Sequence, residues 1–353
     1  MGLALHPRVL ILDEPTAVLT PQETEALFQT LRRAVALGLS IIFISHKLHE
    51  VMRVADRCVV LRHGRVAGEV ATAATDRHQL ATMMVGAEVT RPAVAAVRAG
   101  PVLIRLEGVS TPDQGAVPGL RSLSLDLRAG QIVGLAGVSG NGQGALSDLL
   151  SGLLTPATGR MLLGDAPVTR WSPRAAVQAG IARIPEDRHT TGTIADFSLT
   201  ENAILERYGD APFSRRGWMN RAAADRFARD IIASHDVRCP GPQVRIRLLS
   251  GGNMQKLILG RVLQPGARVI LAHQPVRGLD IGAIAHVQAR LLAARDAGAA
   301  VLLISEDLDE IIEMSDVIHV ISAGRLSPGF ARGAVSVAEL GLWMAGHGFA
   351  DAA

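Results

Sequence analysis

Two adjacent carboxylates follow a run of purely apolar residues near the start of the chain. Asp13 and Glu14 come directly after residues 9–12, and Pro15 follows them. Carboxylate oxygens are hard ligands suited to Mg²⁺, and a carboxylate can also act as a general base. A solvated strand end could carry acidic residues too, but an acidic pair between an apolar run and a proline is poorly explained that way. Asp13 and Glu14 are therefore candidate metal-binding and catalytic residues.

A glycine-rich turn at residues 137–144 could bind phosphate. Gly137 and Gly142 have the G-x-x-x-x-G spacing of a P-loop, in which backbone N–H groups and a helix N-terminus face phosphate oxygens. Gln143 stands where a lysine is expected, and Gly144 where a serine or threonine should reach Mg²⁺. A tight strand–helix turn or a weak dinucleotide-binding turn are the alternatives. The candidate phosphate-binding residues are Gly137, Gly140, Asn141, Gly142, Gln143 and Gly144.

The acidic pair belongs to a block that occurs twice. Residues 9–20 recur in altered form as residues 269–280, and the register of the two copies then continues without a gap. Asp13-Glu14 becomes His273-Gln274, and His46 becomes Glu306. The first copy thus carries side chains suited to catalysis, and the second has lost them.

Apolar strands and amphipathic helices alternate around these residues. Strands are expected at residues 9–12 and 40–45, both of the kind that is buried in a parallel sheet. A capping box at residues 20–23 starts a helix that Gly38 ends, and another helix is expected near 46–54. In the second copy, strands are expected at 103–109, 120–127 and 132–136, with a polar, helix-rich segment at 200–236. The β-α-β order predicts an α/β fold with a parallel core sheet.

The repeat also predicts the domain organisation. We expect the C-terminal part of a first domain at residues 1–88, a linker at 89–100 and a complete second domain at 101–345. If the copies are equal in length, about 160 residues would precede the first one. The chain would then be the C-terminal part of a protein of about 510 residues.

Composition excludes several classes of protein. No apolar run reaches the ~18 residues of a membrane span, and the start of the chain lacks the basic residues of a signal peptide. The formal charge is only +3 without a long basic run, which gives little support to nucleic-acid binding. Lys47 and Lys256 are the two lysines of the chain. A lysine is therefore absent from the glycine-rich turn.

Four motifs together resemble the ATP-binding cassette (ABC) family. LSGGN at residues 249–253 is similar to the family's signature, and LILDEP at 10–15 to its Walker B strand. PEDR at 185–188 occupies the place of the Q-loop, with Glu186 for glutamine, and His46 resembles the switch histidine. The resemblance covers essentially the whole chain. It is strongest to the tandem cassettes of importers for simple sugars and nucleosides.

This resemblance implies a fold and a set of roles. The fold would be a P-loop NTPase-type cassette with a parallel core sheet, an antiparallel subdomain and a helical subdomain, present as one partial and one complete cassette. The two cassettes would face head to tail, so that Asp13 binds Mg²⁺, Glu14 polarises water and His46 contacts the γ-phosphate of ATP. The signature that completes this site would be Ser250, Gly251 and Gly252 of the second cassette.

The second nucleotide site would be degenerate. Changed residues in it are Gln143, Gly144, Glu186, His273, Gln274 and Glu306. Losing a general base typically reduces a rate by about 10²- to 10⁴-fold. We therefore expect hydrolysis at the first site only.

By resemblance, the chain would be the ATP-hydrolysing subunit of a sugar- or nucleoside-type importer. It would lie on the cytoplasmic face of the inner membrane, bound to integral permease subunits and serving a solute-binding protein indirectly. One alternative is a soluble tandem cassette that acts on ribosomes or DNA, although residues 67–100 lack the basic connector such proteins need. Another is a fragment that binds nucleotide without hydrolysing it.

Overall fold

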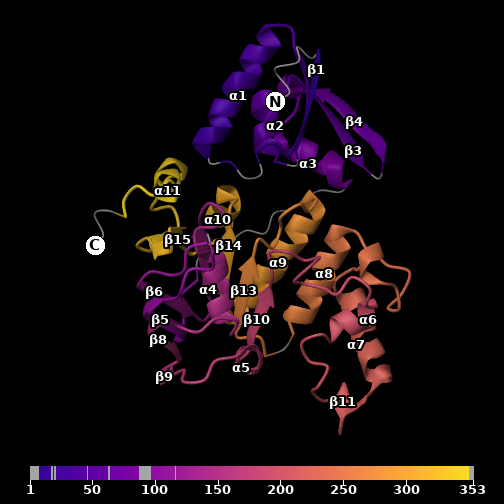
Figure 1. Ribbon diagram of the computed structural model, residues 1–353. Helices are drawn as coiled ribbons and strands as arrows, with labels where there is room; N and C mark the ends of the chain where they lie inside the picture. Colours follow the sequence, from indigo (N-terminus) through magenta and orange to yellow (C-terminus); the bar gives the residue numbers. More distant parts are fainter. Residues whose placement is uncertain are drawn as a thin grey trace. The chain divides into compact units, whose positions relative to one another are not determined.

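The chain divides into two units. The computed structural model describes residues 8–16, 19, 21–45, 47–62, 64–86, 97–115, 117–264 and 266–349. The first unit comprises Met1–Pro92 with Asp280–Ala285, and the second Ala93–Leu279 with His286–Ala353 (Figure 1). The predicted domain boundary at residue 88 and most of the predicted linker lie outside the described residues.

The first unit contains two small sheets and three helices among its described residues. A parallel pair is formed by β1 and β2, and an antiparallel pair by β3 and β4. The turn between α1 and β2 contains Gly38 at φ 92°, a left-handed conformation that glycine adopts without a steric penalty. The elements are β1 (Val9–Asp13), α1 (Pro21–Ala36), β2 (Ser40–Ile44), α2 (Leu48–Val54), β3 (Arg57–Arg62), β4 (Arg65–Ala71) and α3 (Arg77–Val85).

The expectation that β1 and β2 are buried on both faces is wrong for the described structure. Val9 and Ile11 are 51% and 63% exposed, and Ile42 and Ile44 of β2 lie on the same open face. Phe28 of α1 is buried and packs edge-on against a ring of β2, so the opposite face of the pair is covered. Burial depends on the layers above and below a strand, and an apolar run does not reveal whether both are present.

The second unit has the elements of a larger α/β domain. They are β5 (Val102–Ser110), β6 (Leu123–Arg128), β7 (Ile132–Ala136), α4 (Gln143–Leu150), β8 (Thr158–Leu163), β9 (Ala166–Pro167), α5 (Pro173–Gln178), β10 (Ile181–Ile184), α6 (Leu199–Ala203), β11 (Ser214–Arg215), β12 (Trp218–Met219), α7 (Arg221–Ser234), α8 (Gly251–Val262), β13 (Val269–His273), α9 (Ile281–Asp296), β14 (Ala300–Ser305), α10 (Leu308–Met314), β15 (Val317–Ser322), β16 (Arg325–Leu326), β17 (Phe330–Ala331) and α11 (Val337–Met344). The strand expected from residue 120 starts at 123, because Ser122 takes a left-handed conformation at φ 47°.

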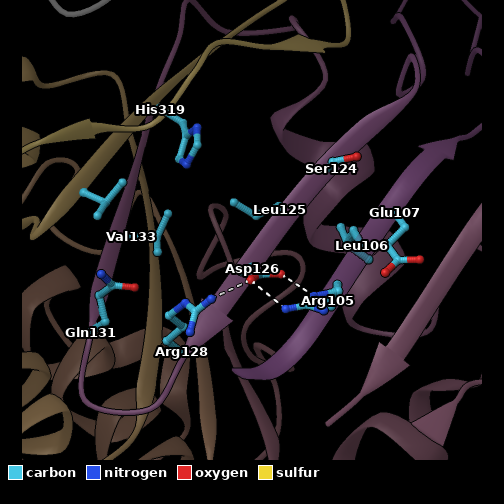
Figure 2. A pocket seen from close by; sticks show the side chains of 11 residues that line it. Arg105, Leu106, Glu107, Ser124, Leu125, Asp126, Arg128, Gln131, Val133 and His319 are labelled. Carbon is cyan, nitrogen blue, oxygen red and sulfur yellow. Dashed lines mark hydrogen bonds and ion pairs between the residues drawn. The ribbon is translucent and has the colours of Figure 1, made fainter. Parts of the chain in front are cut away.

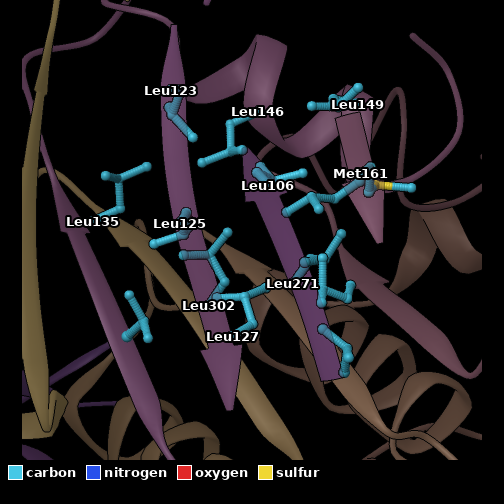
Figure 3. Close-up of a cluster of buried hydrophobic side chains, with 14 of the residues drawn as sticks. Leu106, Leu123, Leu125, Leu127, Leu135, Leu146, Leu149, Met161, Leu271 and Leu302 are labelled. Atoms are coloured by element: carbon cyan, nitrogen blue, oxygen red, sulfur yellow. The ribbon is translucent and has the colours of Figure 1, made fainter. Parts of the chain in front are cut away.

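Two sheets enclose the main core of the second unit. The central sheet has the order β10-β13-β14-β7-β15-β16, and its strands β10, β13, β14, β7 and β15 are parallel. The second sheet is antiparallel, with the order β6-β5-β8-β9. Leucines from both sheets and from α4 interdigitate between them (Figure 3). This arrangement confirms the predicted parallel core sheet and antiparallel subdomain.

A helical region completes the unit. Helices α6, α7 and α8 pack together beyond β10 (Figure 1). Of these, α6 and α7 lie in the segment predicted to be polar and helix-rich, and α8 follows it. No described helix combines the length and apolar character needed to cross a bilayer.

Candidate functional site

The acidic pair lies at the carboxyl end of β1. Asp13 is the last residue of the strand, and Glu14 follows in a left-handed conformation at φ 44°, with its N–H donating to the carbonyl oxygen of Ile44 at 2.9 Å. Both side chains belong to exposed residues. A non-glycine residue at positive φ is strained and is often found at functional sites. The predicted switch histidine, His46, lies outside the described residues.

The same turn occurs at the end of β13 in the second unit. His273 ends that strand, and Gln274 adopts φ 51° with its N–H donating to the carbonyl oxygen of Ile304 at 2.8 Å. The same positive-φ turn after a strand is therefore present in both units. Only its side chains differ, and Gln274 is buried where Glu14 is exposed.

His273 is a poor replacement for a metal-binding aspartate. It is 6% exposed, and burial lowers its pKa from 6.5 to about 4, with a further lowering by the charge of Arg183. At neutral pH the imidazole is uncharged, so its 3.6 Å approach to Glu186 Oε2 is not an ion pair. Mg²⁺ prefers oxygen ligands, which a buried neutral imidazole does not offer.

Glu186 also pairs with an arginine that sequence reasoning missed. Arg277 Nη1 donates to Glu186 Oε1 at 2.7 Å, and the carbonyl oxygen of Arg277 accepts from Arg188 Nη1 at 2.7 Å. Arg277 stands at the position that Ala17 occupies in the first copy. The sequence signal that could have identified Arg277 is an arginine that appears in the copy where His273 and Gln274 replace the two carboxylates. The predicted site residue Glu306 lies between β14 and α10 and is half-buried.

The glycine-rich turn connects β7 to α4 as expected. Gly140 and Gly142 have φ of 82° and 112°. The turn is braced on the loop after β15, because Asn141 Oδ1 accepts from Ala323 N at 2.8 Å and the carbonyl oxygen of Asn141 accepts from Gly324 N at 2.9 Å. A side chain at Gly137 would lie 2.7 Å from the carbonyl oxygen of Ile321. The chain path here requires glycine.

The side chain of Gln143 points back into this turn. It is 5% exposed; its Oε1 accepts from Asn141 N at 2.9 Å and its Nε2 donates to the carbonyl oxygen of Val138 at 2.8 Å. Beside it, a Cβ at Gly144 would meet no described atom within 4 Å. The turn has the shape of a phosphate cradle, but one of its N–H groups is already bonded.

The predicted signature residues begin helix α8. Ser250 is the N-cap, and its hydroxyl accepts from Asn253 Nδ2 at 2.9 Å. Gly251 and Gly252 are the first two helical residues, so their N–H groups have no carbonyl partner within the helix. The positive end of a helix dipole and such N–H groups suit an anion.

A separate groove lies on the strands β5, β6, β7 and β15 (Figure 2). It encloses about 550 Å³. Asp126 accepts from Arg105 Nε at 2.8 Å and from Arg128 Nη2 at 2.9 Å, so the charges that line the groove are largely paired with each other. Gln131 lies at the start of β7, and the glycine-rich turn follows its end. The groove is therefore distinct from the candidate site.

Comparison with known proteins places this arrangement in context. Residues 120–277 match the family model described as "ABC transporter". The chain is 41% identical over 339 residues to a guanosine import ATP-binding protein of Bacillus subtilis, covering 96% of this chain and 66% of that protein. It is 38% identical over 339 residues to a nucleoside import ATP-binding protein of Lactococcus lactis, covering 96% and 67%. A ribose import ATP-binding protein of Rubrobacter xylanophilus is 37% identical over 330 residues, with 92% and 64% covered.

The chain thus spans about two thirds of the length of these curated relatives. Among solved structures, a nucleotide-free ATP-binding cassette of an ABC transporter has a TM-score of 0.56 at 19% identity, covering 65% of this chain and 92% of that one. The ADP conformation of another cassette has a TM-score of 0.54 at 19% identity, covering 71% and 97%. These likenesses confirm the α/β cassette fold. The family match falls within the second unit, so it does not confirm the predicted partial cassette in the first.

Proposed function

Because the chain belongs to the family of ABC transporter ATP-binding proteins, we propose that it binds and hydrolyses ATP to energise the import of nucleosides or simple sugars. The observation that carries this proposal is the match to import ATP-binding proteins over 96% of the chain, including both units. The 41% identity to a guanosine importer, against 39% to a glucose importer and 37% to a ribose importer, is the reason to test guanosine first.

The chemistry is assigned to the first unit. Asp13 and Glu14 are exposed carboxylates on a strained turn at a strand end. Their oxygens fit Mg²⁺, which would offset phosphate charge when bound. Asp13 would hold the metal ion, Glu14 would orient and deprotonate the attacking water, and His46 would contact the γ-phosphate. Ser250, Gly251 and Gly252 would donate N–H groups to nucleotide phosphate, as the family resemblance implies.

We also propose that the first unit is part of a second cassette-like module. Val9, Ile11, Ile42 and Ile44 are exposed there. Their counterparts at the 260-residue offset are Val269, Leu271, Leu302 and Ile304, each no more than 2% exposed in the core that the antiparallel sheet and α4 cover. An equivalent covering layer on the first unit would bury the same apolar face.

Permease subunits of the importer would be the direct partners, and a solute-binding protein an indirect one. The chain would then act at the cytoplasmic face of the membrane. This assignment rests on the printed functions of the relatives.

Uptake of labelled solutes tests the proposal. The gene that encodes the chain would be deleted, and uptake of guanosine, ribose and glucose would be measured with and without a plasmid copy. We expect guanosine uptake to be lost on deletion and to return with the parent sequence but not with Asp13→Asn. Unchanged uptake of all three solutes after deletion would refute the proposed function.

A further inference from the structure

We propose that the Gln143 side chain occupies the phosphate cradle of the second unit and keeps nucleotide phosphate out of it. The inference rests on the proposed function in taking ATP as the ligand that such a cradle would bind. It assigns Gln143 a role other than the ligand contact that its position in the motif predicts. The glutamine acts as an internal substitute for phosphate.

Hydrogen bonding within the loop supports this role. A P-loop binds phosphate through backbone N–H groups that point into the turn. In the second unit the N–H of Asn141 donates to Gln143 Oε1 at 2.9 Å, while Gln143 Nε2 donates to the carbonyl oxygen of Val138 at 2.8 Å. Both ends of the amide are therefore bonded across the loop, and the side chain is 5% exposed. A phosphate could take this place only by displacing a buried amide from two hydrogen bonds.

The charged groups at the carboxyl ends of β10 and β13 are also engaged with each other. Glu186 accepts from Arg277 at 2.7 Å, and His273 is uncharged at neutral pH because its burial lowers the pKa to about 4. The residues at the strand end thus provide neither a carboxylate pair for Mg²⁺ nor a lysine for the phosphates. These side chains make their contacts with each other.

The loop nevertheless has room for the missing groups. A Cβ at Gly144 meets no described atom within 4 Å, and this residue has an ordinary helical φ, so a serine fits there. A lysine at 143 is one atom longer than glutamine and adds a charge that can reach phosphate. Restoring both residues therefore tests occupancy of the cradle without disturbing the path of the loop.

Amide hydrogen exchange of residues 137–150, measured with and without Mg-ATP, gives a readout confined to this loop. We expect ATP to leave exchange unchanged in the parent chain and to protect these residues in Gln143→Lys and in the Gln143→Lys/Gly144→Ser double variant. The gain in affinity should be about tenfold or more, since hydrogen bonds to charged groups are strong. Gln178→Lys, an exposed position at the end of α5, adds the same charge elsewhere and should give no protection.

A second measurement needs no nucleotide. Gln143→Ala should speed exchange in the same segment by about two- to tenfold, because Asn141 N–H loses its acceptor. Gln178→Ala should leave it unchanged. Either equal protection by ATP in the parent and Gln143→Lys chains or unchanged exchange in Gln143→Ala would overturn the inference. Unchanged uptake of all three solutes after deletion of the gene, with Gln143→Lys still gaining ATP protection, would refute the importer proposal alone.

Discussion

At the scale of single residues, two glutamates at equivalent positions of the repeat are both buried but differ in the side chain that can donate a hydrogen bond to them. Glu50 is 2% exposed and accepts a hydrogen bond from the Thr16 hydroxyl at 2.6 Å. Its counterpart Glu310 is 4% exposed, and the position that corresponds to Thr16 is Val276. Neither carboxylate oxygen of Glu310 accepts a well-formed hydrogen bond from a described residue, and Ser305 offsets only part of the effect of burial on its pKa. Burial, with smaller effects of Asp307 and Glu313, raises its pKa from 4.5 to about 8.

We therefore predict that Glu310 makes stability depend on pH. Between pH values near 4.5 and 8 the folded protein binds more protons than the unfolded chain, so the free energy of unfolding falls as pH rises through this window. Glu310→Gln should remove that slope and stabilise the second unit by roughly 1–3 kcal/mol at the upper end. Denaturant unfolding of the parent and of Glu310→Gln at several pH values measures both the slope and the stabilisation.

A matched variant sharpens this test. Val276→Thr supplies the hydroxyl that Thr16 supplies in the first unit, so it should lower the pKa of Glu310 and move the slope to lower pH. A pH dependence that is the same in the parent, Glu310→Gln and Val276→Thr would contradict the assignment. The exchange of threonine for valine is visible in the sequence. The burial of Glu310 depends on the packing of α10 and was not predictable.

At the scale of elements, a substitution at the start of helix α8 should impair function without changing stability much. Gly252 is the second residue of the helix, where a negative side chain interacts favourably with the helix dipole. We predict that Gly252→Asp changes the free energy of unfolding by less than about 1 kcal/mol. The same carboxylate would repel a phosphate at the helix start, so ATP hydrolysis by the assembled transporter should fall strongly. A rate of hydrolysis in this variant equal to that of the parent would show that the proposed signature is not part of the nucleotide site.

The strands β1 and β13 provide a second prediction at this scale. Leu271 is fully buried, whereas its counterpart Ile11 is 63% exposed. Leu271→Ala should cost about 2–5 kcal/mol, the usual range for a core leucine. Ile11→Ala should stay within about 0.5 kcal/mol, as exposed substitutions do. Unfolding followed by hydrogen exchange in each unit compares the two, and equal costs would show that the face of β1 is covered in solution.

These elements also show what sequence reasoning could and could not reach. Apolar runs ended by glycine and capping residues located β2, β7 and α1 closely, because those signals are local. The open face of β1 was not predictable, since it depends on a layer distant in sequence. Arg277 and the inward turn of Gln143 were missed for the same reason: a motif identifies positions and leaves side-chain partners undefined.

At the scale of the whole molecule, the two units that carry the repeat differ in their side chains. The turn after β1 and the turn after β13 share a strained backbone, but carboxylates are present only in the first. The second unit contributes helix α8, which we propose begins with the signature, and a loop in which Gln143 bonds across the proposed phosphate cradle. The sequence repeat predicts the difference in carboxylates, whereas the hydrogen bonds of Gln143 were not predictable from it.

The most direct test of this asymmetry is ATP hydrolysis by the proposed transporter, measured side by side for Glu14→Gln and Gln274→Glu. Glu14→Gln should reduce the rate by about 10²- to 10⁴-fold, the usual effect of losing a general base. Gln274→Glu should leave the rate nearly unchanged, because His273 and Gln143 still deny that site its metal and its phosphate. Equal losses from Glu14→Gln and Gln274→Ala would contradict the account.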